Sequence, residues 1–215
     1  MNQKDKEEAL PQEASMDEQR QEIWLIRHGE TAWSATGRHT GRTDVPLTEA
    51  GKLQAEALKR RLAGRSFPLV LSSPLKRASE TCRIAGYASS TLFTDDLMEW
   101  DYGLYEGRTT ESIREEAPDW TIWTGNPPGG ETLAQVAGRA DNIVKQVKEA
   151  GSDVAIFAHG HMLRVLAACW LGMPPDAGRL LSLSTASVSS LGYERENRVI
   201  VMWNNICHLP GENCG

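Results

Sequence analysis

The sequence lacks the long apolar segments that a membrane protein or a secreted precursor would carry. No stretch of its 215 residues approaches the roughly 18 apolar residues of a transmembrane helix. The first twenty or so residues are polar and charged, and no apolar segment follows the start, so we expect no signal peptide. We expect residues 1–21 to form a disordered polar tail and the protein to be cytoplasmic.

Cysteine motifs are also missing. The chain has four cysteines, but none forms a CxxC pair or a Cys/His spacing typical of a metal site. Cys82 and Cys169 lie in apolar helical contexts, which favours a role in the core. This usage indicates a reducing compartment. Cys207 and Cys214 could pair near the C-terminus, and the sequence leaves that pairing open.

An excess of positive charge is absent too. The formal net charge is −6 and the isoelectric point is near 5.4, which argues against nucleic-acid or anionic-membrane partners. A net-acidic protein that binds an anion must gather its few cations into one pocket. The oligomeric state is not defined by the sequence.

Short apolar runs alternate with segments of helical periodicity along the chain. This order predicts an α/β fold with three layers, α/β/α, whose central sheet is mostly parallel. The last two strands should add an antiparallel edge. Expected strands cover residues 22–27, 68–71, 91–94, 153–158, 186–194 and 198–204. Expected helices cover residues 48–63, 75–85, 109–116, 119–124, 131–150 and 161–171.

We expect a single domain over residues 22–209, with a small helical cap insertion at about 105–130 and a short C-terminal tail at 210–215. In the helix that Thr48 caps, Leu53, Ala57, Leu58 and Leu62 are predicted to share the buried face.

Two buried strands end in polar groups. Arg27 and His28 follow the first strand, and a His-Gly pair, His159 and Gly160, follows the strand at 153–158. Ligands of parallel α/β sheets bind at the carboxyl ends of the strands. If these two strands are neighbours, two imidazoles and a guanidinium converge at one edge of the sheet.

These residues belong to longer motifs: LIRHGET (25–31), HTGRTDVPLTEAG (39–51), SSPLKRASET (72–81), EWDYGLYEG (99–107), GGET (129–132) and FAHGHMLR (157–164). In this order they resemble the histidine phosphatase superfamily, which contains the cofactor-dependent phosphoglycerate mutases and their phosphatase relatives. The resemblance covers about residues 22–209.

The resemblance implies a role for five residues. His28 would be the nucleophile that forms a phosphohistidine. Arg27 and Arg77 would hold the phosphoryl oxygens. His159 would donate a hydrogen bond to the phosphoryl group and, as imidazolium, add positive charge. Glu99 would act as general acid and then as general base.

The resemblance also implies four substrate-binding residues: Ser34, Thr40, Gly41 and Tyr102. Asp101 is a competing carboxylate near Glu99, but the motif selects Glu99. We expect His39, His161 and His208 to be structural or rim residues, with His161 able to reach the pocket mouth. No metal and no cofactor are implied, because arginines take the place of a cation.

The chain departs from the mutases in three places. Mutases carry an arginine pair after a tryptophan in the segment over the active site, whereas residues 122–126 (IWTGN) contain none. The tail after His208 is short, which gives little shielding of a phosphohistidine from water. Ser34 stands where mutases have an asparagine. These differences favour the branch that resembles sugar bisphosphatases and broad-specificity phosphatases.

The expected function is therefore metal-independent hydrolysis of small phosphorylated metabolites, with sugar phosphates favoured. A cofactor-dependent phosphoglycerate mutase is the alternative. A phosphoprotein phosphatase acting on phosphohistidine or phosphotyrosine ranks lower, because its smallest members lack a cap. A binding protein without catalysis would have lost one of the five residues, and all five are present.

Overall fold

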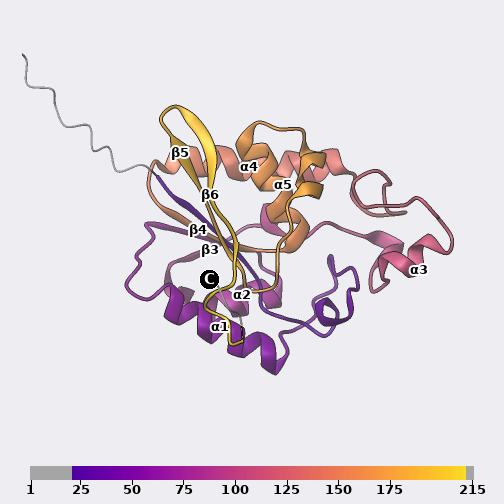
Figure 1. Cartoon of the computed structure of the whole chain (residues 1–215), viewed down its shortest axis with the longest axis horizontal. Helices are drawn as coiled ribbons and strands as arrows, with labels where there is room; N and C mark the ends of the chain where they lie inside the picture. Colours follow the sequence, from indigo (N-terminus) through magenta and orange to yellow (C-terminus); the bar gives the residue numbers. More distant parts are fainter. Residues whose placement is uncertain (1–20, 212–215) are drawn as a thin grey trace, which may run out of the picture.

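A computed structural model describes residues 21–211, which form one mixed sheet with helices on both faces (Figure 1). The six strands lie in the order β3-β2-β4-β1-β5-β6. The first four are parallel, and β5 and β6 are antiparallel, so the expected fold class is confirmed. The strands are β1 (Ile23–Arg27), β2 (Leu69–Ser72), β3 (Thr91–Phe93), β4 (Val154–Ala158), β5 (Val188–Glu194) and β6 (Asn197–Asn205).

Helices α1 and α2 cover one face of the sheet, and α4 and α5 cover the other (Figure 1). Helix α3 belongs to the expected cap segment and lies at one end of the molecule, away from the β5–β6 hairpin (Figure 1). The helices are α1 (Glu49–Arg61), α2 (Lys76–Ile84), α3 (Thr110–Arg114), α4 (Leu133–Ala150) and α5 (Gly160–Leu171), with short 3-10 turns η1 (Ser34–Thr36), η2 (Ala88–Ser90), η3 (Asp95–Leu97), η4 (Gly103–Tyr105) and η5 (Pro175–Leu180).

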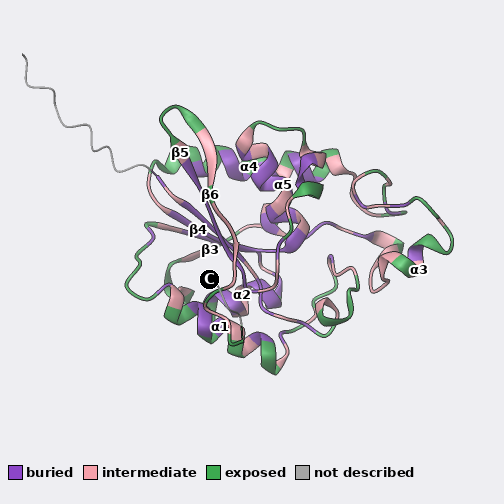
Figure 2. Ribbon diagram, in the orientation of Figure 1, coloured by how far each residue is buried: buried purple, intermediate pink, exposed green. Residues whose placement is uncertain are grey.

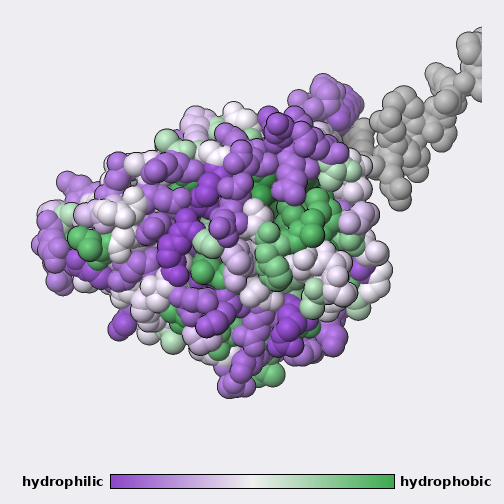
Figure 3. Space-filling view, turned by 180° about the vertical axis from the view of Figure 1, so that it is seen from behind, coloured by the Kyte–Doolittle hydropathy of each residue, from purple (hydrophilic) through white to green (hydrophobic). Residues whose placement is uncertain are grey.

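The sheet separates two apolar cores. Ile23 and Leu25 of β1 pack with α4 and α5, whereas Trp24 and Ile26 pack with α1 and α2. Successive side chains of a strand point to opposite faces, so a strand between two helical layers must be apolar throughout. Figure 2 shows the resulting buried centre of the sheet. On the rear face, hydrophilic residues surround a smaller hydrophobic area (Figure 3).

The segment at 119–124 is not a helix, so that expectation is wrong. Its residues form turns that close on the side chain of Trp120. The indole Nε1 of Trp120 donates to the carbonyl of Gly125 at 2.9 Å, and Arg114 Nε donates to the carbonyl of Trp120 at 3.0 Å. These hydrogen bonds occupy backbone carbonyls that a continuing α-helix would use for its i to i+4 backbone hydrogen bonds.

Gln21, the last residue of the expected N-terminal tail, packs against the domain. Gln21 is buried, and its amide nitrogen donates to the carbonyls of Val147 at 2.8 Å and Ser152 at 2.6 Å. Gln21 therefore belongs to the fold, while the rest of the predicted tails, residues 1–20 and 212–215, lies outside the described residues. Across the part of the chain that the structure describes, no helix is long and apolar enough to cross a membrane.

Two of the cysteines match their expected place. Cys82 is buried and Cys169 is partly buried, and both carry free thiols. Cys207 is disulfide-bonded, a point that the sequence had left open. Cys214 lies outside the described residues.

Helix α1 begins as expected, and three of the four residues expected on its buried face, Ala57, Leu58 and Leu62, are buried. The Thr48 hydroxyl accepts a hydrogen bond from the Gly51 backbone at 3.0 Å and so caps the helix. The buried positions within α1 are Gly51, Ala55, Ala57 and Leu58, whereas Leu53 is 67% exposed. At about 100° per residue, Leu53 lies about 200° round the helix from Gly51, which is the solvent side. Its assignment to the core was wrong.

We expect Leu58→Ala to lower the free energy of unfolding by about 2–5 kcal/mol, because it leaves a cavity beneath a fully buried side chain. Leu53→Ala is the matched control on the same helix and should change stability by less than about 0.5 kcal/mol. Urea titrations of both variants measure the difference. Equal losses would contradict the observed orientation of α1.

Candidate active site

Two histidines meet where β1 and β4 end. The strands pair in parallel with Arg27 opposite Ala158, and the His28 backbone donates to the Ala158 carbonyl at 3.0 Å. The rings of His28 and His159 have centroids 5.2 Å apart. The two strands are therefore neighbours, as expected, and their polar ends converge.

His28 is held in one neutral tautomer. Its Nδ1 lies 2.7 Å from the Gly29 carbonyl, which only accepts, so Nδ1 carries the proton. Burial lowers the pKa of His28 well below its ordinary value of 6.5, and the guanidinium groups of Arg27 and Arg77 lower it further. Within residues 21–211, Nε2 has no hydrogen-bond partner. An imidazole lone pair is therefore available at Nε2.

The loop after His28 is fixed by close backbone contacts. The Gly29 backbone donates to the Thr81 hydroxyl at 3.0 Å, and that hydroxyl donates to the Arg77 carbonyl at 2.6 Å. A Cβ on Gly29 would lie 2.5 Å from the carbonyl oxygen of Gly51 in α1. Any side chain at this position would clash with α1 and displace the loop. Glycine therefore allows the close contact with α1 that positions His28.

His159 is neutral, not an imidazolium as expected. Arg77 Nε donates to His159 Nδ1 at 3.1 Å, and because a guanidinium cannot accept, Nδ1 must hold a lone pair. The proton is on Nε2, which lies 2.8 Å from the Ser73 hydroxyl. Burial lowers the pKa of His159 well below 6.5, and Arg77 adds to the effect. His159 can therefore donate one hydrogen bond but brings no charge.

Arg77 lies behind the pocket. It is fully buried, and besides His159 it binds the carbonyls of Thr40 at 3.0 Å, Gly41 at 2.8 Å and Thr43 at 3.0 Å. Four acceptors on two elements make this guanidinium the support of the loop at residues 40–43. Its expected contact with a phosphoryl group stays a prediction.

Arg27 points into the pocket with unused donors. Its Nη1 donates to the carbonyl of Leu183, and its buried Nε has no partner in the described chain. A Cβ on Gly160 would lie 3.3 Å from Arg27 Cζ, so this glycine leaves room for the guanidinium beside the start of α5. A buried N–H group without a partner costs free energy, and an oxyanion in the pocket would satisfy it.

Glu99 is bound by backbone at the start of α5. Its carboxylate accepts hydrogen bonds from Trp100 at 3.0 Å, His161 at 3.0 Å and Met162 at 2.8 Å, and the residue is 5% exposed. These three backbone N–H donors fix the orientation of the carboxyl group at the N-terminus of α5. Asp101 instead accepts from the Gly103 backbone at 2.9 Å and does not line the pocket.

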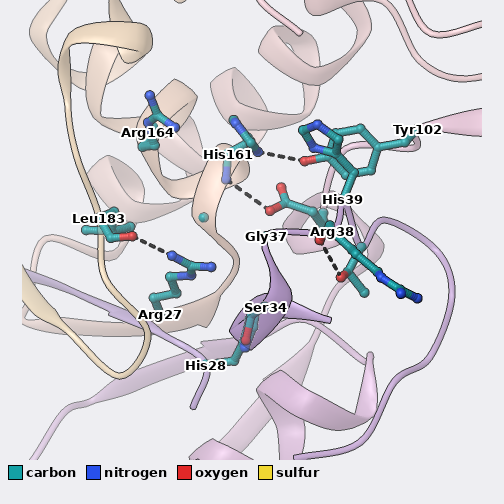
Figure 4. A pocket seen from close by; sticks show the side chains of 13 residues that line it. Arg27, His28, Ser34, Gly37, Arg38, His39, Tyr102, His161, Arg164 and Leu183 are labelled. Carbon is teal, nitrogen blue, oxygen red and sulfur yellow. Dashed lines mark hydrogen bonds between the residues drawn. The ribbon is translucent and has the colours of Figure 1, made fainter. Parts of the chain in front are cut away.

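Arg27, His28 and Glu99 line a pocket of about 180 Å³, whereas His159 and Arg77 are not part of its lining (Figure 4). Of the four expected substrate-binding residues, Ser34, Thr40 and Tyr102 line it, and Gly41 does not. Gly41 is packed so tightly that a Cβ would lie 2.1 Å from a carboxylate oxygen of Glu106. The full lining is Arg27, His28, Ser34, Gly37, Arg38, His39, Thr40, Glu99, Tyr102, Gly160, His161, Arg164 and Leu183.

Sequence reasoning missed Arg164 and placed His39 and His161 only at the rim. Arg164 closes the FAHGHMLR motif, and a residue three positions after His161 lies on the same face of a helix. That spacing could have identified Arg164. Leu183 carries no signal of its own, because it reaches the site only through its carbonyl. Within residues 21–211, no group of three or more His, Cys, Asp or Glu side chains is arranged to hold a metal ion.

The fold and this edge of the sheet define an α/β enzyme with an anion pocket around an imidazole. The model of the histidine phosphatase superfamily (branch 1) matches residues 23–206. The chain belongs to this superfamily and is a phosphatase.

Several known proteins are similar to this chain. An acid phosphatase of Mycobacterium tuberculosis is 42% identical over 184 residues, which are 84% of this chain and 90% of that protein. Sedoheptulose 1,7-bisphosphatase of Saccharomyces cerevisiae is 34% identical, over 69% of this chain and 67% of that protein. A probable phosphoglycerate mutase of Salmonella choleraesuis is 32% identical, over 85% and 89%.

Solved structures agree with the fold. The product of a Mycobacterium tuberculosis open reading frame superposes with a TM-score of 0.82 at 41% identity, covering 86% of this chain and 97% of that one. A mycobacterial glucosyl-3-phosphoglycerate phosphatase superposes with a TM-score of 0.77 at 28% identity, covering 86% and 98%.

The buried neutral histidines predict a pH dependence of stability. The folded pKa of His28 lies below its unfolded value of about 6.5, so below that pH the unfolded chain binds a proton that the native state does not. The contribution of neutral His28 to the free energy of unfolding is therefore fully present above pH 6.5 and decreases as the pH falls below that value. We expect His28→Gln to remove about 1.4 kcal/mol of the loss between pH 7.5 and pH 5.5. Urea unfolding at both pH values measures it, and identical losses in the two proteins would contradict a neutral His28.

Proposed function

We propose that this chain hydrolyses phosphomonoesters of small metabolites, sugar phosphates among them, without a metal ion and through a phosphohistidine at His28. The observation that carries the proposal is the tautomer of His28. With its proton on Nδ1, it presents the Nε2 lone pair inside a pocket where Arg27 has unused donors. A neutral nucleophile beside a cation suits attack on a phosphorus atom that is surrounded by negative oxygens.

The reaction proceeds in two transfers. In the first, Nε2 of His28 attacks phosphorus, an N–P bond forms, and the bond from phosphorus to the alcohol oxygen breaks. Glu99 gives the leaving alcohol a proton. In the second, water attacks the phosphohistidine while Glu99 takes a proton from it, and inorganic phosphate leaves with Nε2 restored.

The other groups stabilise the transferring phosphoryl. Arg27 donates to its oxygens and carries the positive charge. His159 turns its Nε2–H from Ser73 to a phosphoryl oxygen, because Arg77 keeps the proton on that nitrogen. Arg77 contributes charge from behind His159.

Support for a small substrate comes from the size of the pocket and from the relatives. About 180 Å³ accommodates a phosphoryl group and a small part of its alcohol. Two of the similar proteins, the acid phosphatase and the sugar bisphosphatase, are named for the hydrolysis of phosphate esters, which supports the same reaction here. The similarity to a probable phosphoglycerate mutase keeps the mutase as the alternative, and the lack of an arginine pair at residues 122–126 weighs against it. The cytoplasmic location stays a prediction.

We expect His28→Ala to reduce phosphate release at least about 10³-fold, because no other group can form the covalent intermediate. The assay contains EDTA and a panel of esters: sedoheptulose and fructose bisphosphates, 3-phosphoglycerate, phosphoserine and p-nitrophenyl phosphate. Acid-sensitive, alkali-stable labelling of the wild type by ³²P-substrate, lost in the variant, identifies the phosphohistidine.

His208→Gln is the matched control for this experiment, because His208 is half-buried, binds the carbonyl of Ala186 at 3.0 Å and does not line the pocket. It should keep normal turnover. Full activity of His28→Ala would rule out the mechanism, and interconversion of phosphoglycerates with little phosphate release would establish the mutase.

Glu99→Gln tests proton transfer to the leaving group. For sugar phosphates, whose alkoxide is a poor leaving group, we expect kcat to fall about 10²–10⁴-fold. For p-nitrophenyl phosphate, which needs no protonation, the formation of phosphohistidine in a rapid-quench experiment should fall far less. Melting temperatures check that the start of α5 stays folded. An equal loss of rate with both leaving groups would contradict the assignment of Glu99 as the acid.

A further inference from the structure

The GGET motif at residues 129–132 does not line the pocket, but it binds the segment that carries Glu99. The backbone N–H of Glu131 donates to the Asp101 carbonyl at 3.0 Å, and its carbonyl accepts from the Trp100 indole Nε1 at 2.7 Å. The Glu131 carboxylate accepts a further hydrogen bond from the Asp101 backbone N–H at 2.9 Å. Glu131 therefore fixes the chain immediately after Glu99.

Arg139 of α4 fixes the same segment on the other side of Glu99. Its Nη1 donates to the carbonyls of Asp96 at 2.9 Å and Met98 at 2.8 Å. Its other donors bind the Glu131 carboxylate, with Nε 2.9 Å from Oε1 and Nη2 2.8 Å from Oε2. A bidentate pair of this kind adds geometric specificity as well as energy. The Glu131–Arg139 pair, here called the clamp, thus holds the backbone before and after Glu99.

The clamp is largely shielded from water. The side chains of Glu131 and Arg139 are 16% and 15% exposed. Burial alone would raise the pKa of Glu131, but hydrogen bonds from Arg139 and the Asp101 N–H, with the charges of Arg139 and Arg42, lower it below its ordinary value of 4.5. The carboxylate is therefore charged at neutral pH, and its hydrogen bonds to Arg139 are of the strong, charge-assisted kind.

The clamp also reaches two other segments of the site. Arg42 Nη2 lies 3.4 Å from Glu131 Oε2, which connects the clamp to the loop at residues 40–43. Arg139 Nη1 lies 3.7 Å from the sulfur of Met162, whose backbone N–H donates to the Glu99 carboxylate at 2.8 Å. Since neither member of the clamp lines the pocket, any effect on the reaction must pass through Glu99.

We propose that Glu131 and Arg139 are positioning residues for proton transfer by Glu99, because they fix residues 98–101 so that the Glu99 carboxyl meets the leaving oxygen. The proposal rests on the proposed function, since it assumes that Glu99 is the general acid. No proton passes through the clamp itself. A displacement of about 1 Å at a catalytic group costs about 10²-fold in rate, so a contact outside the pocket can control the chemistry.

Glu131→Gln tests the clamp, because it removes the charge and keeps the backbone hydrogen bonds of residue 131. With a sugar phosphate, whose alkoxide leaves only with a proton, we expect the rate of phosphohistidine formation to fall about 10–10²-fold. With p-nitrophenyl phosphate, whose leaving group needs no proton, it should fall less than about threefold. Rapid-quench trapping of the ³²P-labelled phosphohistidine measures both rates, and melting temperatures check folding.

Two further variants accompany this one. Glu131→Asp keeps the charge, so it should fold even if Glu131→Gln does not, but its side chain is too short to bind Arg139 and the Asp101 N–H together. It should show the same dependence on the leaving group with a loss of about three- to tenfold. Glu149→Gln is the matched control, since it breaks an exposed ion pair with Lys145 on the same helix. It should leave both rates unchanged.

A double-variant cycle separates positioning from a general loss of structure. The side chain in Glu99→Gln has no acidic proton to give. Adding Glu131→Gln to it should therefore slow phosphohistidine formation from the sugar phosphate by less than about twofold more. The proposal is overturned if the two losses multiply, if Glu131→Gln alone slows both leaving groups equally, or if it slows neither.

Amide hydrogen exchange reports on the clamp without turnover. In Glu131→Gln we expect the N–H groups of Trp100 and Met162, which bind the Glu99 carboxylate, to exchange at least about tenfold faster, with the centre of α4 unchanged. If the wild type hydrolyses no ester but exchange rises in this way, the proposed function fails and the clamp on Glu99 stands. If hydrolysis depends on Glu99 but Glu131→Gln changes neither rate nor exchange, the clamp fails and the proposed function stands.

Discussion

The hydrogen bond from Arg77 Nε to His159 Nδ1 is the contact on which the site depends. It joins α2 to the end of β4, and the same guanidinium binds the carbonyls of the loop at residues 40–43. Through it, three segments far apart in the sequence hold one arrangement. It also decides chemistry, because a donor at Nδ1 leaves the proton of His159 on Nε2, the nitrogen that faces Ser73. Burying this arginine without its acceptors would be costly, so the loop and the histidine stabilise each other.

A second constraint follows from the crowding of cations. Three arginines, the buried imidazoles of His28 and His159 and the partly buried imidazole of His161 lie at one edge of the sheet of an acidic protein. Desolvation and the guanidinium charges keep His28, His159 and His161 neutral. Each of them is bound at Nδ1, by the Gly29 carbonyl, by Arg77 and by Tyr102. The partner sets the tautomer in each case, and so one Nε2 offers a lone pair while the other two offer protons.

Much of the fold followed from periodicity. Apolar runs of strand length predicted all six strands to within two residues at either end, because a central strand must be apolar on both faces. The errors lie where local pattern competes with tertiary contacts. Leu53 fits a helical stripe, but the side of α1 that packs is chosen by Gly51 and its contact with Glu30. The turns at residues 119–124 depend on where the Trp120 indole finds its acceptor.

The sequence by itself determined the order of strands and helices, the strand ends that carry Arg27, His28 and His159, and the family motifs around them. These properties are local, because the periodicity of apolar residues and the identity of turn residues can be read from neighbouring positions in the chain. Only the tertiary structure decided the protonation of the histidines, the place of Arg77 behind the pocket and the contact of Glu131 with the backbone of Asp101. Each of these depends on a partner distant in the chain, and the free energy of a buried charge or proton is set by the groups that surround it.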